Sequence, residues 1–253
     1  MTVPVGEFGW LESVLLASTR IIAFLVIAPP FSYGAIPKRV RAMLGLGLAL
    51  AVSSTLPRTG AAYDTAAFVE TLVAQVLIGV VLGFLVQLAF SAVQSSGGLI
   101  DLFGGFQLAQ GYDPQSLVNG AQFTRLFQMT AIALLFTTDG YQMVIGGVAR
   151  SFTAIPLGGM FDLSLTAKAL TQGVTDMFVA TVQIAGPLIL VLFLADVGLG
   201  LLTRIAPALN AFSLGFPLKI LITIMFSATA FVLLPGIVSS LMSNGLQMLQ
   251  GVK

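Results

Sequence analysis

The chain has 253 residues, of which 57% are hydrophobic and only 8% are charged, and its 11 basic and 10 acidic side chains nearly cancel. A soluble domain of this size carries about 25% charged residues, so the composition excludes an ordinary soluble protein and indicates a membrane protein. Cysteine and histidine are absent, which removes disulfides, thiolate nucleophiles, histidine acid–base chemistry and most zinc or haem ligation. We therefore expect a protein that is not an enzyme and that uses no cofactor or metal, and the few, scattered basic residues argue against a nucleic-acid partner.

Apolar runs bounded by glycine, proline or charge predict an all-α fold with six helices. In chain order they are 8–29, 39–56, 66–98, 122–150, 172–203 and 216–249. Acidic rather than basic residues precede the first run, unlike a cleaved signal peptide, so we expect that run to stay in the mature protein.

The lengths of these runs do not fit a simple series of membrane spans. The second run is closed by Pro57 and offers about 16 apolar residues, or about 24 Å, which is short of the roughly 30 Å hydrocarbon core. The third has no charged residue from Thr71 to Ile100, and as one helix of about 45 Å it must bend, break or extend beyond a bilayer. Such uneven lengths favour helices that pack mainly against other protein.

Charged residues inside or beside the apolar runs are few. Arg20 and Asp196 lie within runs, where a charge costs roughly 2.5 to 3.5 kcal/mol, so we expect each to have a structural partner. Lys38, Arg39 and Arg41 form the one basic cluster, which fits either an anchor at anionic headgroups or a contact with an acidic partner.

The third run carries a polar or small stripe at helical spacing, made of Gln87, Ser91, Gln94, Gly98 and Asp101. The stripe fits either a pore-facing or subunit-interface surface, or ordinary hydrogen bonding between helices of the same chain. Upstream, Gly79 and Gly83 permit the close approach of another helix.

The stretch FGGFQLAQGYDPQSLVNGAQF, residues 103–123, follows that stripe. Glycines loosen its backbone, an Asp-Pro pair favours a turn, and bulky side chains stand between them. Bulky apolar residues on such a loop can close a pore by excluding water, although a plain connecting loop packed on its neighbours explains the same composition. The candidate gate residues are Gly104, Gly105, Phe106, Leu108, Gly111, Tyr112, Asp113 and Pro114.

The connection between the last two runs, TRIAPALNAFSLGFPLKI, is unusually polar and rich in proline. Because proline removes a helical hydrogen bond, we expect Pro207 and Pro217 to set a broad kinked corner. This hairpin tip would meet either headgroups or neighbouring subunits. Its candidate interface residues are Arg204, Pro207, Asn210, Phe212, Phe216, Pro217 and Lys219.

Several segments together resemble the FliR family of flagellar export-gate proteins, whose injectisome counterpart is the SctT group. They are TRIIAFLVIAPPFSYGAIPKRVRAML, GGFQLAQGYDPQS, LLFTTDGYQMVIGG with the following IPLG, and LFLADVGLGLLT followed by RIAPALNAFSLGFPLKI. The resemblance extends from about residue 10 to residue 245. The stretch FSLGFPLKI looks more like the flagellar branch than the injectisome branch.

The resemblance implies one export-gate domain built of kinked helical hairpins, with a FliP-like part over about 1–170 fused to a FliQ-like helical hairpin over 171–253. It implies a plug loop at 104–116, where Gly111 stands in place of a bulky apolar residue. It also implies assembly with FliP-like and FliQ-like subunits, contact with FlhB-like and FlhA-like export proteins and membrane lipid, and a place in the bacterial cytoplasmic (inner) membrane at the flagellar basal body.

The function that this resemblance implies is a type III secretion channel for unfolded flagellar proteins. Energy would come from other components, because the sequence has no G-x-x-x-x-G-K-[ST] phosphate-binding loop. The alternatives are an injectisome export gate, a polytopic secondary transporter with interrupted helices that uses Asp196, and a membrane scaffold without a conduit.

Overall fold

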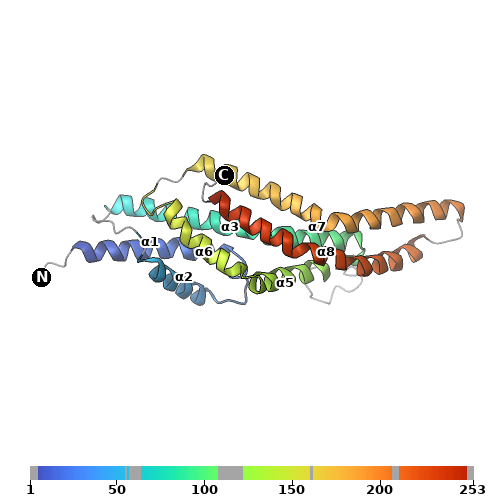
Figure 1. Ribbon diagram of the computed structural model, residues 1–253, viewed down its shortest axis with the longest axis horizontal. Coiled ribbons are helices and arrows are strands. Elements are labelled where there is room, and N and C mark those ends of the chain that lie inside the picture. Colours follow the sequence, from blue (N-terminus) through green and yellow to red (C-terminus); the bar gives the residue numbers. More distant parts are fainter. Residues whose placement is uncertain are drawn as a thin grey trace. The chain divides into compact units, whose positions relative to one another are not determined.

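The computed structural model describes residues 5–54, 56, 64–107, 122–159, 162–206 and 211–249, without the side chains of 5–8, 211–212 and 241–249. Within these ranges the chain forms helices and no strand, so the predicted all-α fold is confirmed (Figure 1). The helices are α1 (Val5–Ile27), α2 (Lys38–Val52), α3 (Thr65–Phe103), α5 (Gln122–Thr137), α6 (Gly140–Ala154), α7 (Leu163–Ile205) and α8 (Ala211–Leu249).

The predicted helix 122–150 is wrong as a single element, because the chain breaks between α5 and α6. Thr138 and Asp139 form the break, and Asp139 adopts a left-handed backbone with φ 55°. Aspartate is one of the few residues that tolerate this conformation. The sequence TTDG contains residues typical of turns, but the apolar residues on either side predict one continuous helix.

The last two helices begin earlier than predicted, and this changes the place of Pro217. Helix α8 starts at Ala211, so Pro217 lies inside it, as does Pro235, while Pro187 lies inside α7. The expectation that Pro217 sits in the corner between the helices is therefore wrong. Proline costs a helix one backbone hydrogen bond, and long apolar helices tolerate that loss.

Four helical segments of the described chain are long and apolar enough to cross a membrane, and the pair α5 and α6 makes a fifth if it forms one span. The four are Gly9–Ile27, Thr65–Phe103, Leu163–Ile205 and Ser213–Ser240. Helix α3 has 39 residues, or about 58 Å at 1.5 Å per residue. It therefore exceeds the roughly 30 Å hydrocarbon core, as its uncharged run predicted.

The chain divides into two compact units, and helices α3, α7 and α8 contribute to both. Unit 1 comprises Met1–Leu88, Asp139–Val174 and Met242–Lys253. Here α1 packs on α2 and on the first part of α3. Gly83 lets the helices approach closely, because an added Cβ there would lie 2.9 Å from the Phe24 carbonyl oxygen, and Gly79 faces Arg20 and Ala23 in the same way. The sequence prediction of a close helix contact at these glycines is confirmed, and the partner is α1.

Unit 2 comprises Ala89–Thr138 and Thr175–Leu241. Its buried apolar side chains come from the end of α3, from α5 and from one face each of α7 and α8. On α7 that face repeats every four residues, as the spacing of an α-helix requires, and consists of Ala180, Ile184, Leu188 and Leu192. Other large apolar side chains of α7, such as Phe178 and Phe193, are exposed.

Candidate functional site

The most deeply buried charge in unit 1 is the guanidinium of Arg20, which has no exposed surface. Its Nε donates a hydrogen bond to Gln75 Oε1 at 2.7 Å, Nη1 donates to the Ser151 carbonyl oxygen at 3.0 Å and to Ser151 Oγ at 3.1 Å, and Nη2 donates to the Ile155 carbonyl oxygen at 2.8 Å. The guanidinium also stacks over the ring of Phe152, 4.3 Å from its centroid. The expectation that Arg20 has structural partners is confirmed.

These partners belong to the end of α6 and to α3. The carbonyls of Ser151 and Ile155 lie in the last turn and the C-cap of α6, where a cation is favoured by the helix dipole. Gln75 in turn donates from Nε2 to the Leu157 carbonyl oxygen at 2.9 Å. Arg20 of α1 therefore joins three segments of unit 1 through neutral acceptors, which the sequence could not identify because they lie up to 135 residues away.

The basic cluster at the start of α2 divides into two kinds of residue. Lys38 and Arg39 are exposed. Arg41 is buried, and its Nη2 donates to the carbonyl oxygens of Ser32 at 3.2 Å and Tyr33 at 2.8 Å. Arg41 thus secures the preceding turn. Of the three basic residues, Lys38 and Arg39 are the two exposed ones that a headgroup or an acidic partner could contact.

In unit 2, Asp101 near the end of α3 holds the first residues of α5. Its Oδ1 accepts from the Phe123 backbone N–H at 2.9 Å, while Oδ2 accepts from the Thr124 backbone N–H and from Thr124 Oγ1, both at 2.8 Å. Asp101 is fully buried. The free N–H groups of a helix N-terminus and its dipole favour such a carboxylate. Asp101 therefore caps α5 from another helix.

Helix α3 approaches α5 closely at the same place. A Cβ on Gly97 would lie 2.7 Å from the Phe123 carbonyl oxygen and 2.8 Å from Thr124 Cα. On the neighbouring Gly98 it would meet only Thr124 Oγ1, at 3.6 Å. Gly97 is thus the position at which α3 has no room for a side chain beside α5.

The residues that follow α3 pack against α8. A Cβ on Gly104 would lie 2.7 Å from both the Ile100 carbonyl oxygen and Thr223 Oγ1. Gly105 has φ +83°, a left-handed conformation that glycine adopts without strain, and it faces the ring of Phe216. Two of the predicted gate residues therefore lie where only glycine fits well.

An aromatic ladder continues from the next residue. The ring of Phe106 meets that of Phe123 at 5.2 Å between centroids, Phe123 meets Phe127 at 6.2 Å, and Phe127 meets Phe231 of α8 at 5.1 Å. All three contacts are edge-to-face, the arrangement that aromatic rings prefer. Phe106 thus packs directly on α5, which in turn contacts α8 through Phe127. The other candidate gate residues, Leu108, Gly111, Tyr112, Asp113 and Pro114, lie outside the described residues.

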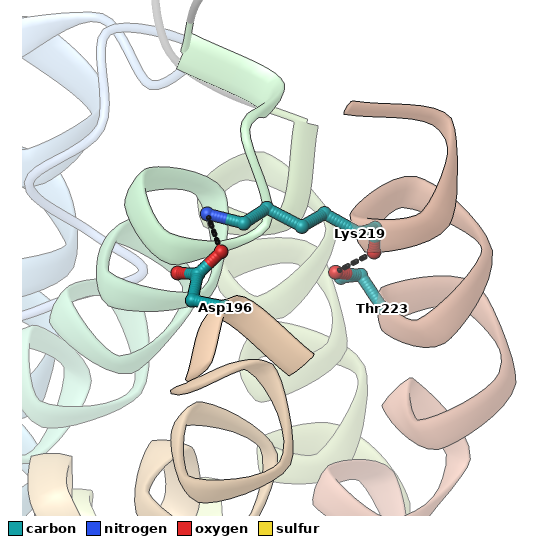
Figure 2. Close-up of polar contacts among 3 residues, drawn as sticks. All are labelled: Asp196, Lys219 and Thr223. Atoms are coloured by element: carbon teal, nitrogen blue, oxygen red, sulfur yellow. Dashed lines mark hydrogen bonds and ion pairs between the residues drawn. The ribbon is translucent and has the colours of Figure 1, made fainter. Parts of the chain in front are cut away.

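Helices α7 and α8 are joined by an ion pair. Lys219 Nζ lies 2.8 Å from Asp196 Oδ1, and the side chains are 26% and 47% exposed, respectively. Figure 2 shows Lys219 extending from α8 to Asp196 on α7, with Thr223 one turn further along α8 donating to the Lys219 carbonyl oxygen at 2.8 Å. The expectation that Asp196 has a partner is confirmed, and that partner is Lys219.

The polar stripe of α3 is not uniform. Asp101 is buried against α5, Gln87 and Ser91 are half-buried, and Gln94 is exposed. The hydrogen bonds of Asp101 fit the second interpretation of the stripe, in which its residues bond to other helices of the same chain. A pore-facing or interface role of Gln87, Ser91 and Gln94 stays a prediction.

The predicted hairpin tip is described in part. Arg204 at the end of α7 is exposed, Phe216 packs on Gly105, and Lys219 is engaged with Asp196. Pro207 and Asn210 lie outside the described residues, as does the side chain of Phe212. The subunit-interface role of this tip remains a prediction.

Together these contacts define a class of protein: an all-α membrane protein in which Arg20, Asp101 and the Asp196–Lys219 pair join its own helices. Over residues 11–245 the sequence matches the family described as bacterial export proteins, family 1. The flagellar biosynthetic protein FliR of Pectobacterium carotovorum subsp. carotovorum is 32% identical over 244 residues, which cover 96% of this chain and 94% of that protein.

Two further relatives carry the same name. FliR of Escherichia coli (strain K12) is 33% identical over 220 residues, 87% of this chain and 84% of that protein, and FliR of Bacillus subtilis (strain 168) is 27% identical over 212 residues, 83% and 82%. The chain belongs to the FliR family of bacterial export proteins and is a membrane-embedded component of the flagellar export apparatus.

Proposed function

We propose that this protein is a non-enzymatic subunit of the flagellar type III export gate in the bacterial cytoplasmic (inner) membrane. It forms with FliP-like and FliQ-like subunits the channel through which unfolded flagellar proteins pass, next to FlhB-like and FlhA-like export proteins. The observation that carries the proposal is the family match over residues 11–245, supported by relatives of the flagellar branch.

The exposed apolar faces of the last two helices support assembly with other subunits. In the apolar window of α8 only 17% of the residues are buried within the chain, against 56% in α3. Large exposed apolar patches mark protein–protein or membrane contacts. Because the apolar segment Ser213–Ser240 has 28 residues, or about 42 Å at 1.5 Å per residue, and the hydrocarbon core of a bilayer covers roughly 30 Å, lipid alone leaves part of this face without apolar cover.

We further propose a FliP-like part over about 1–170 and a FliQ-like hairpin over 171–253. Helices α7 and α8 fit the second part, because they follow one another in sequence and are joined by the Asp196–Lys219 pair. Residues 104–116 are the proposed plug loop. Its first residues, Gly104 to Phe106, are held by α5 and α8.

Asp196 is the residue on which the transporter hypothesis depended. Its carboxylate is paired with Lys219, which fits a structural role better than ion coupling. The family match also favours an export protein over a secondary transporter. Each relative named above is flagellar rather than an injectisome protein.

The test is extraction of the complex from its native membrane in mild detergent, followed by mass spectrometry of the intact particle. We expect this chain to be recovered together with several FliP-like and FliQ-like subunits. Recovery of the chain alone, in detergent that preserves other membrane complexes from the same cells, would contradict the proposal.

A further inference from the structure

We propose that the first turn of α2 binds an anionic phospholipid, whose phosphate meets Lys38 and Arg39 and whose acyl chain runs along α2 into an apolar groove of unit 1. The inference goes beyond the export function and does not depend on it, because it uses contacts within unit 1 alone. Two independent observations carry it: positive charge without a counter-charge, and an apolar surface that leads away from that charge.

The start of α2 holds positive charge that the described part of the protein does not neutralise. Lys38 and Arg39 are exposed and form no ion pair with a described residue. Arg41 is buried and donates to backbone carbonyls of the preceding turn, and its Nε has no hydrogen-bond acceptor among the described residues. The sequence contains no acidic residue from Ser13 to Tyr63. An anion is therefore the counter-charge that this turn lacks.

The backbone of α2 adds to this preference for an anion. Pro37 stands at the N-cap without a side-chain hydrogen bond, and the first turn contains no acidic residue. The N–H groups and the dipole at a helix N-terminus favour negative charge, and phosphate is a common ligand there. Lysine and arginine bind phosphate oxygens through charge-assisted hydrogen bonds. The group that fits this turn is thus a phosphate.

The rest of α2 determines which kind of phosphate compound fits. Beyond Arg41 the helix reads AMLGLGLALAV, without a polar side chain, and Met43 is 73% exposed. The 15 residues of α2 extend about 22 Å and are too few to cross the roughly 30 Å hydrocarbon core. A soluble phosphate uses none of this apolar surface, whereas a phosphate that carries long apolar chains uses both parts of the helix.

One apolar stripe of α2 leads from the basic turn to the groove. Its members follow one another at intervals of four residues and so lie along one side of the helix; they are Val40, Leu44, Leu48 and Val52. Val40 and Leu44 are exposed, at 43% and 42%. Leu48 and Val52 are half-buried and line the groove. An acyl chain that follows the stripe therefore passes from exposed surface into the groove.

The groove lies between α1, α2 and α6, and only apolar side chains line it. Helix α1 contributes Phe24 and α6 contributes Val148, among others. Leu48 and Val52 follow Lys38 by 10 and 14 residues, or about 15 and 21 Å along the helix. One leaflet of the hydrocarbon core is about 15 Å deep, so the end of an acyl chain whose phosphate lies at Lys38 reaches the groove.

An acidic protein segment is the alternative ligand for the two exposed cations. Its carboxylates would pair with Lys38 and Arg39, but the apolar stripe beside them offers no polar group to such a segment. Tyr33, in the turn that Arg41 holds, belongs to the residue types enriched at the headgroup level of membranes. Lysine and arginine near a membrane surface attract anionic headgroups. The combination favours a phospholipid over a protein.

The test uses the purified complex and two photoreactive lipids that differ in their headgroup alone. The probes are phosphatidylglycerol and phosphatidylcholine, each with a photoreactive group at the end of one acyl chain, in nanodiscs of unlabelled phosphatidylcholine. Adducts are mapped by mass spectrometry of peptides. We expect phosphatidylglycerol to label the segments of α2 and α6 that line the groove roughly thirtyfold more than phosphatidylcholine, since each cation near a headgroup contributes about fivefold.

Lys38→Gln, Arg39→Gln should remove this preference, because the double variant has lost both exposed cations. Arg150→Gln, Lys168→Gln is the matched control: it removes two other exposed cations of unit 1 and should keep the preference. Ala149→Leu fills the groove and should lower its labelling by phosphatidylglycerol several-fold at an unchanged amount of complex.

Each contrary result overturns a stated part of the inference. Equal labelling by the two lipids, or a preference that the control variant loses as fully as Lys38→Gln, Arg39→Gln, would overturn the headgroup site. Suppression of the labelling by millimolar inorganic phosphate would identify a soluble phosphate as the ligand. Protein adducts without lipid adducts would assign this side of α2 to a neighbouring subunit. A complex that contains FliP-like and FliQ-like subunits but shows no lipid preference would overturn this inference and leave the proposed function intact.

Discussion

Arg20 shows how a single residue can carry a charge into an apolar helix bundle. Burying a cation in apolar surroundings is costly, and among the described residues all its hydrogen-bond acceptors are neutral. The cost is offset by four hydrogen bonds, by the C-terminal dipole of α6 and by the ring of Phe152. Because each of the three guanidinium nitrogens has its own partner, the planar fork of arginine suits the site and a point charge does not.

We expect Arg20→Lys to destabilise the assembled protein by about 2 to 4 kcal/mol, because an ammonium leaves two or more buried acceptors without donors. The measurement is the thermal midpoint of the purified complex, in which the variant should melt several degrees lower. Arg39→Lys is the control, since Arg39 is exposed at the start of α2. Equal midpoints for the two variants would show that the fork of hydrogen bonds at Arg20 contributes nothing.

At the scale of the elements, the apolar pattern predicted most helices but not their ends. The runs around 8–29 and 39–56 became α1 and α2, because apolar periodicity and the turn at Pro29 to Pro37 agree there. The pattern failed at Asp139, where a left-handed residue breaks an otherwise apolar stretch, and at Pro217, which a long helix absorbs. Neither event alters hydrophobic periodicity, so periodicity could not reveal it.

The candidate site was predictable in its residue types but not in its pairings. The need of Arg20 and Asp196 for partners follows from the cost of a charge in an apolar helix. Their actual partners depend on which helices pack together. Asp101 was grouped with a polar stripe because its spacing fits one, whereas its contacts with Phe123 and Thr124 come from the approach of α5.

The Asp196–Lys219 pair gives a prediction about how α7 and α8 hold together. We expect Asp196→Lys to lower the amount of assembled complex several-fold, because it sets two ammonium groups side by side, while the bond it replaces contributes up to about 1 kcal/mol when exposed. The double variant Asp196→Lys, Lys219→Asp should recover most of the loss. The amount is measured by native gel electrophoresis of detergent extracts, and a double variant no better than the single one would show that the two groups do not interact.

At the scale of the whole molecule, helices α3, α7 and α8 are longer than a bilayer is thick, and much of the apolar surface of α7 and α8 is not covered by the chain itself. Helix α7 has 43 residues, or about 64 Å at 1.5 Å per residue. A protein with such helices depends on its surroundings for its stability, because the apolar faces exposed in the single chain must lie against lipid or other subunits.

We expect a photo-crosslinking amino acid at Phe193, which is 57% exposed on α7, to capture a neighbouring protein subunit in living cells. The same amino acid at the buried Leu192 should give no adduct between subunits. Adducts are identified by mass spectrometry. Capture of lipid alone at Phe193 would show that acyl chains, not subunits, cover this face.

The sequence separation between Arg20 and its acceptors also constrains synthesis. The Ile155 carbonyl is made 135 residues after Arg20, which at about 5 to 20 residues per second is a delay of about 7 to 27 s. Gln75 follows Arg20 after 55 residues, but for the rest of that interval the nascent first helix holds a cation that lacks the acceptors of Ser151 and Ile155. Until α6 is complete, the charge of Arg20 therefore lies in an apolar helix with only part of its hydrogen bonds available, which costs free energy wherever the surroundings are apolar.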